Sequence, residues 1–204
     1  MARPENSTRP FCMTLAQMSA FLVVGVLLVA LAAPTLRGFR EKQSRAQCLS
    51  NLKELGLAMA AYGHSYQGRC PMDGPQPTLA GSFQLFSKPY CGGGNWAISN
   101  AFPVMWCPTD RRPGATRYNG VGVLAASNIS YSYVPGLVWQ DVTPDSPLIL
   151  DRIYATRKGD RWPRNGNYRA AGGNVLYLDG HADWQVSLPS DLKDRLGHAI
   201  VLSP

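Results

Sequence analysis

The chain has 204 residues and a formal net charge of +7, from 20 lysines and arginines against 13 aspartates and glutamates. Many of the basic side chains lie in two segments, residues 37–45 and 152–169. This sparse distribution is typical of a solvated surface and argues against a nucleic-acid-binding protein. The first group fits anionic lipid head groups better, so membrane lipid is the partner that the charge indicates.

The first 36 residues combine a short basic leader, residues 1–12, with an apolar segment. No charged side chain occurs between Arg9 and Arg37, and the apolar side chains concentrate in residues 18–36. A helix over this run has about the length needed to cross a bilayer. We therefore expect a membrane helix in this part of the chain.

The apolar pattern continues in helical form after Pro34. Large apolar side chains recur at intervals of three and four residues, at Leu49, Leu52, Leu55, Met59 and Tyr62. This stripe predicts that one amino-terminal helix covers residues 13–62, with a kink near Pro34, and packs its second half on the domain that follows.

Residues 63–204 predict a β-rich head domain. Glycine, proline, serine and asparagine become frequent there, and the apolar runs become short. The pattern indicates strands in residues 131–142, 146–152, 175–178 and 181–186, the last two joined by a two-residue turn at Asp179-Gly180. A short helix is expected after Ser190. The predicted fold class is α+β, with a long amino-terminal helix packed on a small antiparallel sheet.

Four of the five cysteines lie beyond the apolar segment, at Cys48, Cys70, Cys91 and Cys107. The gaps between them are all about 16 residues or longer, which does not match the short paired spacing of a zinc site. Two disulfides in an oxidising compartment fit better and place the head outside the cytoplasm. Of the three pairings that four cysteines allow, we favour Cys48 with Cys107 and Cys70 with Cys91, each contributing about 3 kcal/mol.

The amino terminus resembles that of type IV prepilins. The basic leader ends at Cys12, Met13-Thr14-Leu15 stands where those proteins have Phe-Thr-Leu, and Pro34 falls at their mid-helix proline. Residues 45–71, 105–110, 129–137 and 172–184 extend the likeness. They are similar to prepilin-like proteins whose carboxy-terminal signature is histidine, nine residues, then Asp-Gly.

This resemblance implies a pilin-like fold and a non-enzymatic function without a cofactor. The chain would be a pseudopilin-like subunit or accessory of a type II secretion or type IV pilus-like assembly. Cys12 and Met13 would flank the processing site, and the new amino terminus would be methylated. The helix that packs against other pilin-like subunits would include Met13, Thr14, Leu15, Gln17 and Pro34.

Three positions differ from the family pattern. Cys12 replaces the glycine that normally precedes cleavage, and Arg169 replaces the signature histidine ten residues before Asp179. Gln17 replaces a glutamate, so the buried charge pair with a neighbouring subunit's amine becomes a neutral hydrogen bond. We expect the apolar segment to be kept, but not cut and assembled in the usual way.

The expected location is the inner membrane, with the amino-terminal helix as anchor and the head in the periplasm or outside the cell. Two other interpretations stay open. Signal cleavage after Ala30-Leu31-Ala32 would secrete a soluble protein. Positive charge is also denser after the apolar run than before it, which by the positive-inside rule would place the head in the cytoplasm.

The sequence offers no convincing set of catalytic or metal-binding residues. Asp179, His181 and Asp183 lie close together, but Asp179 is assigned to the turn, and His181 with Asp183 would form only part of a metal site. We therefore expect neither catalysis nor a bound metal. The alternative function is a membrane-anchored or secreted module that binds glycans through tryptophans, chosen among Trp96, Trp106, Trp139, Trp162 and Trp184.

Overall fold

The computed structural model describes residues 15–91, 103–118, 123–140, 143–153, 161–164, 166–189, 192 and 202–204, without the side chains of residues 16, 32–37, 87–91 and 103. The leader and most of the predicted tail helix lie outside these residues. The chain divides into two compact units, residues 1–42 and 43–204.

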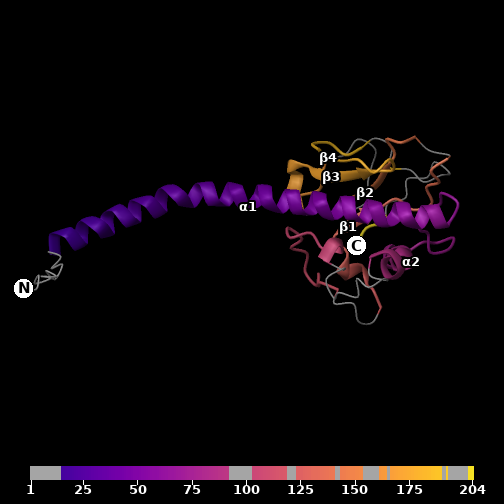
Figure 1. Cartoon of the computed structure of the whole chain (residues 1–204), viewed down its shortest axis with the longest axis horizontal. Coiled ribbons are helices and arrows are strands. Elements are labelled where there is room, and N and C mark those ends of the chain that lie inside the picture. The colour runs from indigo at the N-terminus through magenta and orange to yellow at the C-terminus, as the bar shows by residue number, and fades with distance from the viewer. Residues whose placement is uncertain are drawn as a thin grey trace, which may run out of the picture. The chain divides into compact units, whose positions relative to one another are not determined.

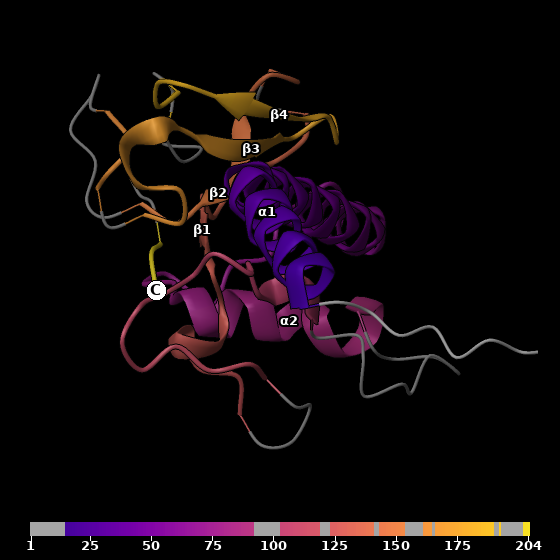
Figure 2. The same ribbon diagram turned by 90° about the vertical axis from the view of Figure 1, so that its left-hand side faces the viewer.

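Helix α1, Leu15–Ser65, contributes residues to both units. In the second unit its buried side chains follow the predicted stripe: Leu52, Leu55, Met59 and Tyr62 are buried, while Leu49 is half-buried. Figures 1 and 2 show this part of α1 lying between helix α2 and the strands. Because the stripe belongs to the core, the second unit begins within the helix, whereas the sequence placed the start of the head at residue 63.

Four antiparallel strands form one sheet in the order β1-β2-β3-β4, which confirms the α+β class. Their bounds are Tyr131–Tyr133, Pro147–Asp151, Gly173–Tyr177 and Ala182–Gln185. The central strands β2 and β3 are buried at every position. The edge of β1 pairs with the carboxy-terminal segment, since the backbone groups of Tyr133 and Leu202 exchange hydrogen bonds of 2.9 and 2.8 Å.

The strand expected over residues 131–142 is shorter than predicted. After β1 the chain turns at Gly136, which has a φ of 75°, and Val138 then pairs with Arg69 just beyond α1. The alternating side chains of this segment therefore reflect burial against the end of a helix as well as against a sheet.

Helix α2, Leu79–Cys91, was not predicted, because the only helix that the sequence indicated in the head was the short one after Ser190. Thr78 caps its amino terminus, because the Thr78 hydroxyl oxygen accepts a hydrogen bond from the Gly81 N–H at 3.1 Å. Leu79, Phe83 and Phe86 share one buried face, and the Phe83 ring meets the Tyr133 ring edge-on at 5.8 Å. The nearby prolines and glycines hid this short apolar stripe.

Strands β3 and β4 form the predicted hairpin, but with a different turn. The Gly180 N–H donates to the Tyr177 carbonyl at 3.0 Å, and the Tyr177 N–H donates to the His181 carbonyl at 2.9 Å. Of the two expected turn residues only Gly180 has a positive φ, at 91°. The loop is therefore the tripeptide Leu178-Asp179-Gly180 with a bulge glycine, which keeps the Leu178 side chain in the core.

Three short 3-10 helices complete the described elements: η1, Pro103–Met105, η2, Ala126–Asn128, and η3, Arg169–Ala171.

Candidate functional site

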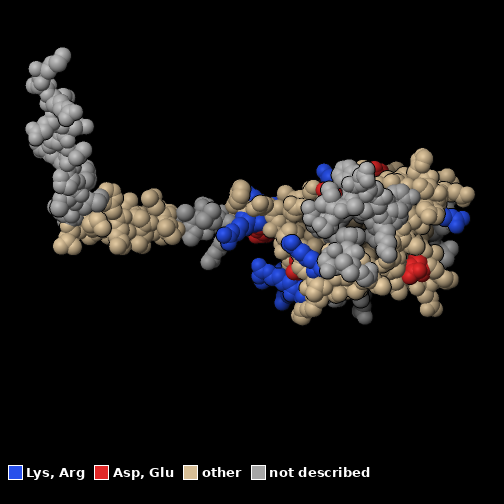
Figure 3. Space-filling view, turned by 60° about the horizontal axis from the view of Figure 1, so that its bottom comes forward, with Lys and Arg blue, Asp and Glu red and all other residues tan. Residues whose placement is uncertain are grey.

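The first half of α1 carries a large, exposed apolar surface. Along residues 15–31 every described side chain is exposed and none is charged, and Figure 3 shows this stretch without blue or red atoms. We call it the apolar helix surface; its large members are Leu15, Met18, Phe21, Leu22, Val23, Val24, Val26, Leu27, Leu28, Val29 and Leu31.

The structure places only some of the residues that the sequence assigned to this helix. Cys12, Met13 and Thr14 lie outside the described residues. Leu15 begins α1 and is 91% exposed, and Gln17, two residues later, is exposed as well. Pro34 is part of the continuous helix, but its side chain is not described.

Two further observations concern the same helix. Arg40 and Lys42 follow the apolar helix surface and are exposed. Among the residues with described side chains, no helix is both long enough and apolar enough to span a membrane.

A disulfide fastens the second half of α1 to the segment that follows η1. Cys48 is bonded to Cys107 across a Cα–Cα distance of 5.3 Å, the pair that the sequence led us to expect. The Asn51 amide donates to the Trp106 carbonyl at 2.9 Å one turn further along the helix. These two links fix α1 against the head through covalent and polar contacts.

The second expected disulfide, between Cys70 and Cys91, is absent, because Cys70 is a free cysteine with a buried thiol. The Cys70 N–H donates to the Leu137 carbonyl at 2.9 Å, and this pairing directs the side chain into the core. Burial raises the pKa of Cys70 to about 12, so the thiol stays protonated and unreactive. The side chain of its expected partner, Cys91, lies outside the described residues.

The described part of the second unit contains two buried carboxylates, Asp110 and Asp151. Asp110 forms ion pairs of 3.2 Å with Arg112 and 3.4 Å with Arg152. Asp151, at the end of β2, instead accepts hydrogen bonds from the Asn174 and Asn167 side-chain amides at 2.9 and 3.1 Å. Both carboxylates are enclosed by protein, so they join loops to the sheet rather than facing a substrate.

The hairpin tip brings together part of the weak metal-binding set. One ligand atom each of Asp145, Asp179 and His181 lies within 4.8 Å of the others, and all three residues are exposed. Asp183 does not belong to this group. The sequence gave no signal for Asp145. This residue lies in a loop that is hydrogen-bonded to the hairpin: the Pro144 carbonyl accepts the Asp179 N–H, and the Ser146 carbonyl accepts the Leu178 N–H.

The Asp179 carboxylate is already hydrogen-bonded to its neighbour His181. Its carboxylate accepts the His181 N–H at 2.9 Å and contacts the His181 ring nitrogen at 2.5 Å. The pKa of Asp179 is lowered, mainly by the backbone hydrogen bond from His181. Arg169 is exposed with a φ of 56°, and within the described part of the chain it makes no contact with Asp179. The signature positions are therefore not assembled into one site here.

The tryptophans do not form a common exposed face. Trp162 is buried, and Trp184 lies under the Arg45 guanidinium, 4.2 Å from the ring centroid. Trp106 is half-buried, and Trp96 lies outside the described residues. Trp139 is the most exposed of the described tryptophans, at 37%, and its ring lies beside Gly63 at the end of α1.

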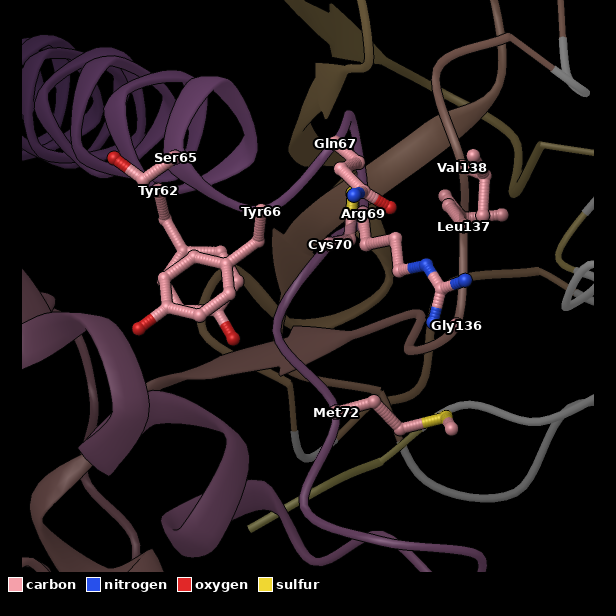
Figure 4. A pocket seen from close by; sticks show the side chains of 10 residues that line it. All are labelled: Tyr62, Ser65, Tyr66, Gln67, Arg69, Cys70, Met72, Gly136, Leu137 and Val138. Carbon is pink, nitrogen blue, oxygen red and sulfur yellow. The ribbon is translucent and has the colours of Figure 1, made fainter.

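A pocket of about 740 Å³ opens next to Trp139. Figure 4 shows Tyr62 and Tyr66 at one end of it and the Arg69 side chain at the other, above Met72. The Tyr62 and Tyr66 rings stack with centroids 4.2 Å apart and planes 16° apart. Reasoning from the sequence missed this site because its residues come from residues 62–72, at and after the end of α1, and from residues 136–138, which only the fold brings together.

Comparison with known proteins found no family model, no curated protein and no solved structure that matches the chain.

Proposed function

We propose that the protein is a non-enzymatic, pseudopilin-like structural subunit, whose apolar helix surface packs against the same surface of other copies and against lipid. The observation that carries this proposal is the exposure of that surface: Phe21 and Leu28 are 64% and 62% exposed, and their large apolar neighbours are exposed as well. Contiguous apolar patches of this kind mark protein or membrane contacts. Removing one leucine or phenylalanine side chain from water contributes about 1.5–3 kcal/mol, so association is strongly favoured.

We further propose that the head lies outside the cytoplasm and that Arg40 and Lys42 meet anionic lipid head groups. The Cys48–Cys107 disulfide supports the first part, because structural disulfides persist in oxidising compartments. The exposure of both basic side chains, 9 and 11 residues after the end of the apolar helix surface, supports the second. The resemblance of the amino terminus to type IV prepilins supports the assembly role.

The first experiment determines the amino terminus of the mature protein isolated from native membranes. A chain that begins at Met13, or one that keeps its leader, retains the apolar helix surface. A chain that begins at Ala33 has lost it, and that result would overturn the proposal in favour of a secreted protein.

The second experiment tests contact between copies. In a Cys12→Ser background, Ala20→Cys places a thiol within the exposed helix, and mild oxidation of membranes should give disulfide-linked dimers. Adding Leu28→Asp should reduce the dimer yield at least tenfold among molecules that remain in the membrane fraction, because a buried unpaired carboxylate is costly.

The matched control is Leu57→Asp, which changes another exposed leucine of α1 in the second unit. It should leave the dimer yield unchanged. Purely monomeric Ala20→Cys protein at native expression would contradict a filament or assembly role and would leave a simple anchor.

A further inference from the structure

The pocket beside Trp139 has a fixed aromatic wall with one free face. Tyr62 is buried, with 8% of its surface exposed, and its ring supports the stacked ring of Tyr66, which is 52% exposed. One face of Tyr66 is therefore held in place while the other faces solvent. A rigid, accessible aromatic face is a surface on which the apolar face of a flat ligand ring can stack.

The charge of the pocket is positive. Among the described residues that line it, Arg69 is the only charged one, and none is an aspartate or glutamate. Among the described residues no carboxylate contacts the Arg69 guanidinium, which is exposed. Its backbone is held by the pairing with Val138 and by a hydrogen bond to the Tyr66 carbonyl at 3.2 Å. The pocket thus presents an exposed cationic donor on a fixed backbone, which favours a carboxylate.

We propose that this pocket binds an acidic polysaccharide, with the apolar face of one sugar ring on Tyr66 and the carboxylate of a neighbouring uronic acid unit on Arg69. An acidic polysaccharide combines the two features that the pocket requires, rings with apolar faces and anionic groups repeated along the chain. The Gln67 side chain, which also lines the pocket, can donate to and accept from ring hydroxyls. This site is separate from the apolar helix surface, so it does not rest on the proposed assembly role.

An acidic peptide fits the same pocket less well. The Cys70 N–H already donates to the Leu137 carbonyl, and the Trp139 N–H donates to the Gly68 carbonyl at 3.0 Å. These two backbone donors are therefore used within the wall and are not available to a peptide that extends a strand. A stacked sugar needs no such edge.

The test is a calorimetric titration of the full-length protein in detergent micelles with trigalacturonic acid at 50 mM salt. We expect saturable binding, with neutral galactotriose at least tenfold weaker. Arg69→Gln should weaken binding of the acidic sugar about tenfold, and Arg69→Lys should weaken it less. Arg111→Gln, which removes an exposed arginine outside the pocket lining, should leave the affinity unchanged.

The aromatic wall is tested in parallel. Tyr66→Phe keeps the stacked ring and should bind normally, whereas Tyr66→Ala should lose at least fivefold, with thermal melting used to show that both variants remain folded. No binding of trigalacturonic acid, equal binding of the neutral sugar, or loss of affinity in Arg111→Gln equal to that in Arg69→Gln would overturn the proposal. Tighter, Arg69-dependent binding of a polyglutamate peptide would overturn the assignment to a sugar.

Discussion

The buried carboxylate of Asp151 accepts two hydrogen bonds from Asn174, one from the backbone N–H at 2.6 Å and one from the side-chain amide at 2.9 Å. Asp151 ends β2 and Asn174 lies in β3, so the contact joins the two central strands of the sheet. It also places an ionisable group where no water reaches it.

Stability should therefore depend on pH through Asp151. Burial raises its pKa from 3.8 to about 6, against the opposing effect of the hydrogen bonds from Asn174 and Asn167. Because the folded state holds this proton more tightly than the unfolded state, the contribution of Asp151 is complete below pH 4. It is lost as the pH rises through 6, at a cost of about 3 kcal/mol.

Urea unfolding of the head, followed by tryptophan fluorescence between pH 4 and 7.5, measures this effect. The free energy of unfolding of Asp151→Asn should fall less over this range than that of the wild type. Asp145→Asn, at an exposed aspartate, should retain the wild-type dependence. Identical pH profiles for Asp151→Asn and the wild type would contradict the prediction.

The disulfide should make a large contribution to stability. It links positions 59 residues apart, and restricting an unfolded loop of that length is worth about 4 kcal/mol. The double variant Cys48→Ser/Cys107→Ser should lose roughly this amount in urea unfolding. Dithiothreitol should lower the melting temperature of the wild type but not that of the double variant, and equal shifts in both would show that the reductant acts elsewhere.

Gly56 should be needed for the close approach of α1 to the sheet. A Cβ atom built at Gly56 would lie 3.0 Å from a methyl carbon of Leu176 in β3. Gly56→Leu should destabilise the head by about 1–3 kcal/mol through overpacking. Adding Leu176→Ala should recover part of that loss, whereas Leu57→Ala, at the exposed neighbouring position, should change stability by less than about 0.5 kcal/mol. The absence of any recovery in the double variant would argue against this contact.

Glycine should be required at position 180 because of its backbone conformation and not because of limited space. No atom lies within 4 Å of a Cβ built there, but its φ of 91° is unfavourable for residues with side chains. Gly180→Ala should cost about 1–2 kcal/mol in thermal or urea unfolding. Gly180→Asn should cost less, because asparagine tolerates positive φ better; an alanine variant as stable as the wild type would exclude the bulge described for this hairpin.

Much of the head could be predicted where one periodic pattern dominated. The stripe from Leu52 to Tyr62 identified the buried face of α1, and the Asp179-Gly180 sequence located the hairpin. Helix α2 was missed because a proline-rich and glycine-rich approach hid the spacing of Leu79, Phe83 and Phe86. Local signals specify local structure, and they fail where a short helix depends on the core that it joins.

The candidate sites also differ in whether the sequence alone could reveal them. The apolar helix surface is contiguous in the chain and could be recognised from composition. The Tyr66 pocket and the approach of Asp145 to Asp179 depend on segments about 70 and 35 residues apart in the sequence, and no periodicity carries that information. The inward orientation of Cys70 likewise follows from its pairing with Leu137, which cysteine spacing does not reveal.

The pairing of Leu202 with Tyr133 determines which contacts of the protein can form early during synthesis and which can form only late. The edge of β1 stays open until the chain has been synthesised through Leu202, whereas both halves of the Cys48–Cys107 crosslink are available about one hundred residues earlier. While the chain is still being completed, α1 can be covalently fixed before the edge of the sheet is paired, and an unpaired sheet edge favours aggregation. A chaperone that acts on this protein would therefore be needed late, after oxidation and before the last strand contact closes.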